Sequence, residues 1–171
     1  MKKPFPKALK EGQVCEKWRA ERLEAAGHSV ERYYDWPKSP KCGPRCPEIG
    51  ATLPDLGTAA FLEDVKGKEK ATYHQNTGYW VHGVNLSDWK DYQKVAEYHA
   101  LPLQLCFVQG TDRVDPVKDG KEGTITRPPP PGVYILRDNV AENHRHEPTD
   151  MIYWRVQDME YLGPDIPDFL S

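Results

Sequence analysis

Apolar residues recur at helical spacing in two stretches of the chain. From about Gly12 to Ala26 they gather on one arc, formed by Val14, Cys15, Trp18, Ala25 and Ala26. Gly27 is a suitable stop for this helix. A second helix is expected between Ser87, a good N-cap, and Pro102, which forbids continuation. Its inward side would hold Trp89, Tyr92, Gln93, Ala96 and Ala100.

Shorter apolar or alternating runs predict strands, at 28–36, 53–56, 61–66, 103–109, 132–136 and 151–156. The run 103–109 is continuously apolar, as in a buried parallel strand, and the last two strands are expected to extend the same sheet. Loops are expected at 57–60, 67–83, 110–126 and 142–147, and an irregular tail from 163. Four consecutive prolines at 128–131 predict a stiff spacer, with a proline-rich ligand for a partner as the alternative.

The chain has 171 residues, of which 38% are hydrophobic and 29% charged. This length suits a single domain, with a core at about 12–109 and a C-terminal extension at about 110–171. The net charge of -3 provides no overall basic field, so any nucleic-acid contact requires a local patch. Because neither a membrane-spanning run nor a signal-peptide core is present, we expect a soluble, intracellular, cytoplasmic protein with no membrane partner.

Four cysteines are spread unevenly, at Cys15, Cys42, Cys46 and Cys106. The first and last fall inside predicted core elements and are expected to be buried thiols. The middle two lie in a turn-rich loop, where a structural Zn²⁺ is conceivable if His144 and His146 supply the other ligands. Because paired zinc ligands usually have a tighter spacing, loop thiols are the favoured interpretation.

Charged residues interrupt the apolar hairpin at 51–66. Since side chains alternate along a strand, Asp64 and Lys66 share one face while Glu63 points to the other. Asp55, at the end of the first hairpin strand, could lie opposite them. Two close carboxylates repel unless a cation lies between them, and their oxygens suit Mg²⁺ or Mn²⁺. An adjacent lysine can offset negative charge or help to activate water, whereas a surface hairpin with a salt bridge is the alternative.

The residues Pro54-Asp55 and Asp64-Val65-Lys66 resemble the signature of the PD-(D/E)xK nuclease superfamily. The resemblance covers about 12–109 and is to the resolvase-like branch and to small phage-encoded nucleases. It implies an α/β fold with a restriction-endonuclease-like core, in which a central mixed β-sheet is flanked by helices in the order αβββαβ and extended by C-terminal strands. It also implies metal-dependent hydrolysis of DNA phosphodiester bonds.

The resemblance assigns roles to individual residues. Asp55 and Asp64 would hold Mg²⁺ or Mn²⁺, and Glu16 would join them, because resolvase-like members often carry a glutamate on the first helix; an exposed helix glutamate is the alternative. Lys66 would orient or activate the attacking water and offset charge in the transition state. Gln93 would approach that water or the phosphate from the second helix, or would simply hydrogen-bond within the core.

Other positions bear on the substrate. Lys68 and Lys70 would reach DNA phosphates from the 67–83 loop, whose aromatic residues could pack on sugar or base, although an ordinary loop is an equal alternative. The spacing from Gln93 to Tyr98 is one residue longer than in the exonuclease branch, which favours an endonuclease.

The sequence therefore predicts a Mg²⁺-dependent deoxyribonuclease, conceivably acting on branched DNA as a homodimer. A non-catalytic nucleic-acid-binding or protein-binding member of the same fold is the first alternative. A zinc-stabilised structural module is the second.

Overall fold

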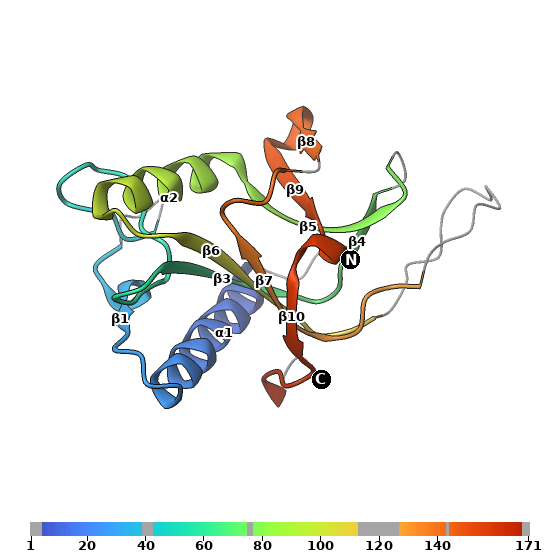
Figure 1. Cartoon of the computed structure of the whole chain (residues 1–171), viewed down its shortest axis with the longest axis horizontal. Coiled ribbons are helices and arrows are strands. Elements are labelled where there is room, and N and C mark those ends of the chain that lie inside the picture. The colour runs from blue at the N-terminus through green and yellow to red at the C-terminus, as the bar shows by residue number, and fades with distance from the viewer. Residues whose placement is uncertain (1–4, 39–42, 75–76, 113–126, 143, 169–171) are drawn as a thin grey trace.

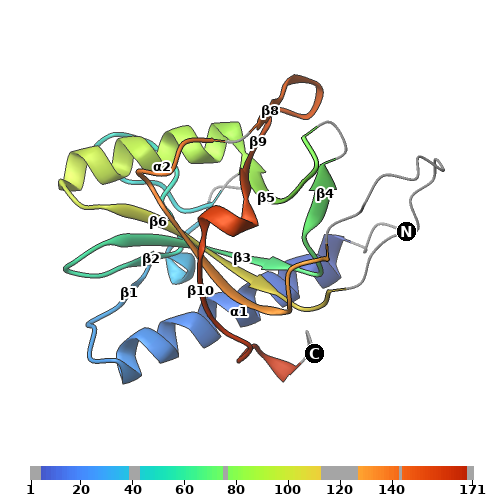
Figure 2. The same cartoon turned by 45° about the vertical axis from the view of Figure 1, so that its right-hand side comes forward.

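The computed structural model describes residues 5–38, 43–74, 77–112, 127–142 and 144–168. This part of the chain has an α/β architecture, with helices α1 (Phe5–Ala25) and α2 (Leu86–His99) on opposite faces of a mixed sheet (Figures 1 and 2). The strands are β1 (Glu31–Arg32), β2 (Leu56–Gly57), β3 (Leu62–Lys68), β4 (Thr72–His74), β5 (Tyr79–Asn85), β6 (Leu103–Gln109), β7 (Gly132–Arg137), β8 (His144–His146), β9 (Met151–Arg155) and β10 (Glu160–Gly163).

The larger sheet has the strand order β1-β2-β3-β6-β7-β10. Strand β6 runs parallel to β3, whereas the other neighbours in this sheet are antiparallel. Every residue of β6 is buried, so the prediction of a buried parallel strand at 103–109 is confirmed. The register places Asp64 beside Leu105 and Lys66 beside Phe107, which fixes both charged residues near the centre of the sheet.

Helix α1 covers one face of this sheet. Its apolar side, with Cys15, Ala20 and Leu23, packs in one buried cluster with Val65 and with apolar residues of β6 and β7. The helix lies so close to β3 that a Cβ added at Gly67 would be 3.0 Å from Sγ of Cys15. It starts at Phe5 instead of about Gly12, but it ends as predicted, because Gly27 adopts a positive φ of 94°.

The other face carries α2 and a second sheet with the order β4-β5-β9-β8 (Figure 1). Trp89 of α2 meets Trp154 of β9 edge to face, with ring centroids 5.1 Å apart, in the larger core cluster. The N-cap of α2 is Asn85 and Ser87 lies inside the helix, so the helix starts two residues earlier than predicted. The helix ends at Ala100, whose φ is 52°.

Several predicted strands and loops need correction. The strand at 28–36 shrinks to β1, because the chain enters a short 3₁₀ helix at Tyr33–Asp35. The expected loop at 67–83 instead contains the end of β3, all of β4 and most of β5, since its aromatic and β-branched residues pair as a hairpin. The polar loop at 142–147 contains β8.

The C-terminal part of the chain contributes to both sheets. As predicted, β7 extends the larger sheet, but β9 pairs with β5 in the second sheet. The tail expected from 163 is preceded by β10, which pairs with β7. Most of the loop expected at 110–126 lies outside the described residues. No helix in the described part of the chain is long and apolar enough to cross a membrane.

Candidate active site

Asp64 and Lys66 lie on β3 and point to the face that α2 covers, as strand alternation predicts. Nζ of Lys66 lies 2.7 Å from Oδ2 of Asp64 and 5.8 Å from the ring centroid of Tyr92 on α2. The Asp64 side chain is 1% exposed, whereas that of Lys66 is 29% exposed. The ion pair is therefore shielded on the carboxylate side and open to solvent on the lysine side.

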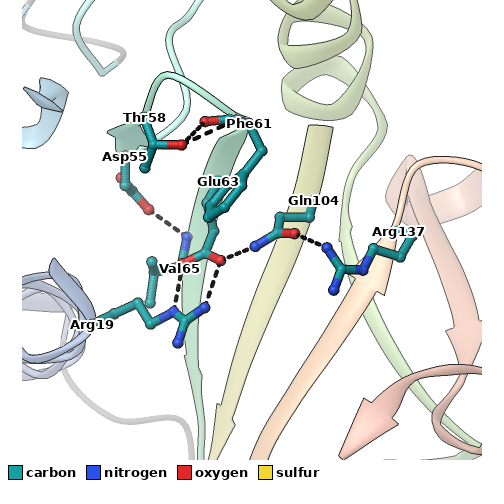
Figure 3. A network of polar contacts seen from close by, with 8 residues as sticks. All are labelled: Arg19, Asp55, Thr58, Phe61, Glu63, Val65, Gln104 and Arg137. Carbon is teal, nitrogen blue, oxygen red and sulfur yellow. Dashed lines mark hydrogen bonds and ion pairs between the residues drawn. The ribbon is translucent and has the colours of Figure 1, made fainter. Parts of the chain in front are cut away.

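Asp55 reaches the same strand from the segment before β2. Strand β2 pairs with β3 only at Glu63 and Leu62, so the ladder stops before Val65. The Oδ2 atom of Asp55 accepts a hydrogen bond of 2.8 Å from the Val65 amide, as Figure 3 shows. Asp55 thus replaces the missing strand partner at this edge and is held beside Asp64, as the sequence predicts.

Glu16 approaches this site from α1. Its Oε2 atom is buried and has no hydrogen-bond partner among the described residues. Burial raises the pKa of Glu16, with the charges of Lys38 and Lys66 opposing that rise and Asp64 adding to it. The predicted third carboxylate therefore lies within electrostatic reach of Asp64 and Lys66.

The carboxyl groups at this site disfavour one another's charged forms. Burial raises the pKa of Asp55 well above its ordinary value, the Asp64 charge raises it further, and Lys66 offsets only part of this rise. Oδ1 of Asp64 is also buried without a hydrogen-bond partner in the part of the chain that is described. Lys66 thus acts on all three carboxyl groups and Lys38 on Glu16 as well, while buried oxygens of Glu16 and Asp64 remain without hydrogen-bond partners in the described part of the chain.

Lys66 is held in its charged form. Burial lowers its pKa, but the charge of Asp64, followed by Tyr92 and Asp55, outweighs this effect and leaves the pKa well above its ordinary value. Tyr92 is 4% exposed, and burial and Asp64 raise the pKa of its hydroxyl. The sequence placed Tyr92 only in the core, because its position over Lys66 depends on how α2 packs on β3.

The prediction that Gln93 points inward is wrong. The buried side of α2 consists of Leu86, Trp89, Tyr92, Val95 and Ala96, and Gln93 is exposed. It lines a separate surface pocket with Glu97 and Asp138. Because adjacent helix residues are turned by about 100°, Gln93 cannot share the direction of Tyr92 toward β3.

Lys68 points to the same face of β3 as Asp64 and Lys66, but its ammonium group is hydrogen-bonded to the second sheet. Its Nζ donates a 2.9 Å hydrogen bond to the Gly83 carbonyl of β5. Burial, and then the charge of Lys66, lowers the pKa of Lys68 to about 8. Lys70 lies beyond the end of β3 and is partly exposed. The structure therefore places Lys68 near the site but does not direct it outward as a phosphate contact would require.

Glu63, the neighbouring acid, belongs to a different network on the α1 face. Its carboxylate accepts hydrogen bonds of 2.7 and 3.0 Å from the Arg19 guanidinium and a further bond from Gln104. Gln104 in turn accepts a 2.6 Å bond from Arg137 (Figure 3). Glu63 is fully buried and its charge is matched, so Asp64 is the acid that faces the lysine.

The zinc alternative gains no support from the residues that can be described. Cys42 lies outside them, and Cys46 is buried with its thiol donating to a glutamate. His144 instead packs on His74, with ring centroids 4.2 Å apart. Within the described ranges, no group of three or more His, Cys, Asp and Glu side chains is arranged to hold a metal ion as it stands.

The comparisons with known proteins give no family for this chain. No protein-family model matches the sequence, and a search of curated proteins returned no match either.

The buried ion pair between Arg19 and Glu63 gives a stability prediction. Arg19→Met leaves a fully buried carboxylate without its cation, so we expect the free energy of unfolding to fall by about 3–5 kcal/mol. Urea denaturation of the wild type and the variant measures this loss. Lys17→Met, which removes an exposed cation from the same helix, should change the value by less than about 0.5 kcal/mol. Similar losses in both variants would contradict the assigned importance of the buried pair.

The crowded carboxyl groups predict an unusual pH dependence. Because the pKa of Asp55 is higher in the folded than in the unfolded chain, its contribution lowers the free energy of unfolding as pH rises between those two values. Asp55→Asn keeps an acceptor for the Val65 amide but removes the charge. We therefore expect it to raise the free energy of unfolding at pH 7 by about 1 kcal/mol and to flatten this fall with pH.

Urea denaturation between about pH 4 and pH 8 would measure both effects. Glu97→Gln, which neutralises an exposed carboxylate on α2, serves as the matched control and should leave the pH profile unchanged. If Asp55→Asn were less stable than the wild type throughout this range, the expectation that burial and the Asp64 charge make the ionised Asp55 unfavourable in the folded chain would be wrong.

Proposed function

We propose that the chain is a divalent-metal-dependent nuclease that hydrolyses DNA phosphodiester bonds. The observation that carries this proposal is the buried Asp64 paired with Lys66, together with Asp55 and Glu16, whose carboxyl groups lie close enough for the Asp64 charge to raise their pKa values. Buried oxygens of Glu16 and Asp64 lack hydrogen-bond partners among the described residues. Such an arrangement is costly to folding and is typical of sites shaped for a ligand cation.

The order of elements supports the restriction-endonuclease-like core within this proposal. Helix α1 is followed by β1, β2 and β3, and α2 is followed by β6, which lies parallel to β3. This is the expected αβββαβ order, interrupted by β4 and β5 and extended by β7 and β10. Asp64 lies on β3, Asp55 before β2 and Glu16 on α1, and this distribution supports the proposal, whereas Gln93 is exposed on α2.

The donor set fits Mg²⁺ or Mn²⁺. Asp55 and Asp64 would hold the ion with Glu16, because hard carboxylate oxygens are the ligands that these ions prefer. The bound ion would supply Lewis-acid stabilisation of the phosphate and a more acidic water. Burial is the main cause of the raised pKa values of Asp55 and Glu16, and a cation would also offset the Asp64 charge, which adds to both rises.

Lys66 would act as a charged group and not as a base. Its raised pKa keeps the ammonium protonated near neutral pH, so it can donate hydrogen bonds but cannot accept a proton. The ammonium group, on a side chain that is 29% exposed, would orient the attacking water or offset negative charge on the phosphate. The Tyr92 ring packs against the same ammonium group and would limit the directions in which Lys66 can point.

Lys66→Ala should abolish cleavage. We expect wild type to cut at least one of linear, supercoiled, single-stranded and four-way-junction DNA with Mg²⁺ or Mn²⁺ but not with EDTA, and Lys66→Ala to be slower by about 100-fold or more. Asp64→Asn should show a similar loss. Labelled DNAs resolved on gels measure the rates, and the preferred substrate distinguishes cutting of ordinary DNA from cutting of branched DNA.

The matched control is Lys90→Ala, which removes an exposed lysine from α2 and should cleave like wild type. All variants are first checked for folding by circular dichroism. Because resolution of a junction needs two sites, light scattering on the same samples tests the homodimer. If the folded wild type cuts none of these DNAs, the nuclease proposal is wrong and a non-catalytic binding protein of this fold takes its place.

A further inference from the structure

A second cavity, of about 470 Å³, lies between the second sheet and the proline tract at 128–131. Four aromatic side chains line it: Tyr79, Trp80, Tyr134 and Tyr161. None of them belongs to the acidic site on β3. The volume falls in the range of about 300–1,000 Å³ that is typical of sites for small organic groups.

One wall of this cavity is fixed in place by hydrogen bonds to proline carbonyls. The Gln109 amide donates a 2.9 Å bond to Pro129, and the Tyr161 hydroxyl donates a 2.9 Å bond to Pro131. The Tyr134 hydroxyl donates to Pro130. The wall is thus tied to β6, β7 and β10, and a ligand would lose little affinity in ordering it.

Aromatic side chains form much of the cavity lining. The Tyr134 and Tyr161 rings lie 5.0 Å apart at 41°, and both hydroxyls are already bonded to the wall. Arg127 and Gln157, which are exposed, add one cation and one amide to the lining. An aromatic lining with a guanidinium and an amide nearby suits a nucleotide of a DNA strand. Its base can stack on aromatic rings, and the phosphates of the strand attract arginine.

The strand register relates the cavity to the acidic site. Lys66 is paired with Phe107, Phe107 with Tyr134, and Tyr134 with Tyr161, so these residues form one row across β3, β6, β7 and β10. With strands about 4.8 Å apart, Tyr161 lies about 14 Å from Lys66. The rise of about 3.4 Å per nucleotide in duplex DNA makes this separation at most about four steps along a strand, and fewer where an unpaired strand is extended.

His82 of β5 stacks on Phe107 in the middle of this row, with ring centroids 4.8 Å apart. The stack separates the cavity from the acidic site, although both lie on the same face of the larger sheet. A strand engaged at Lys66 could therefore place a base in the cavity only several nucleotides away from the bond that is cut.

We propose that the aromatic cavity binds an unpaired base of the DNA substrate, a few nucleotides from the phosphate at Lys66. This assignment rests on the proposed function, and it narrows the substrate to DNA with a single-stranded portion. The Trp80 and Tyr161 rings stack on the base, and Arg127 contacts a neighbouring phosphate.

A binding experiment in EDTA tests this assignment without relying on cleavage. Fluorescence anisotropy would compare an oligonucleotide of about eight thymidines with an abasic strand of the same length, which keeps the phosphates. We expect wild type to bind the thymidine strand about tenfold more tightly than the abasic strand. Trp80→Leu, which keeps apolar bulk but removes the stacking ring, should bring this ratio close to one.

Tyr98→Leu is the matched control, because Tyr98 is an exposed aromatic residue on α2 outside the cavity, and it should keep the wild-type ratio. Tyr161→Leu should lower the ratio as Trp80→Leu does, which covers the case in which Trp80→Leu fails to fold. Arg127→Gln should weaken binding of both strands equally.

Equal binding of the two strands by wild type, or a ratio unchanged in Trp80→Leu and Tyr161→Leu, would overturn the assignment and leave an occupant other than a base. If the protein cleaves DNA in a Lys66-dependent way but shows no base-dependent binding, the cavity assignment is wrong and the nuclease proposal stands. Base-dependent binding without any cleavage would instead refute the nuclease proposal and keep the cavity as a site for an unpaired base.

Discussion

The structure depends on how two adjacent carboxylates are accommodated on one buried strand. Glu63 and Asp64 are both essentially inaccessible to solvent, and strand alternation turns them to opposite faces of the larger sheet. Each must therefore find compensation from a different layer, because a buried charge without a partner is strongly destabilising. On the α1 face, Arg19 and Gln104 satisfy Glu63, and that network ties the helix to three strands.

The opposite face is left incompletely compensated. Lys66 pairs with one oxygen of Asp64, while burial and the Asp64 charge disfavour the charged forms of Asp55 and Glu16, an effect that Lys66, and at Glu16 also Lys38, offsets only in part. The contrast with Glu63 is informative, because the same sheet provides a well-matched carboxylate only one residue away. The fold satisfies Glu63 fully but leaves the carboxyl groups around Asp64 incompletely compensated, which lowers stability at that site. Local destabilisation of this kind is characteristic of functional sites.

Much of this site could be predicted from local patterns. Alternation along β3 was enough to join Asp64 with Lys66 and to separate Glu63, and Gly27 and Pro102 marked where helices stop. Features that depend on packing between layers were not predictable. The helical arc of α2 was too broad to decide that Gln93 faces solvent while Tyr92 lies over Lys66. The polar content of 67–83 hid β4 and β5, whose pairing partner β9 lies far along the chain.

The second sheet divides one face of the larger sheet, the face to which Lys66 points, into two regions: the acidic site and the aromatic cavity. Gln109 accepts a hydrogen bond from His82 with its amide oxygen and donates to the Pro129 carbonyl with its amide nitrogen. His82 can donate in this way without carrying charge, because burial, and then the nearby charge of Lys68, lowers its pKa to about 3. A neutral His82 can stack on Phe107 beside Lys68 without adding a second positive charge to this buried layer. His82 and Gln109 therefore fill the core between the acidic site and the aromatic cavity, and Gln109 also holds the proline wall in position. The spacing between the two regions is thus set by the packed interior and not by surface loops.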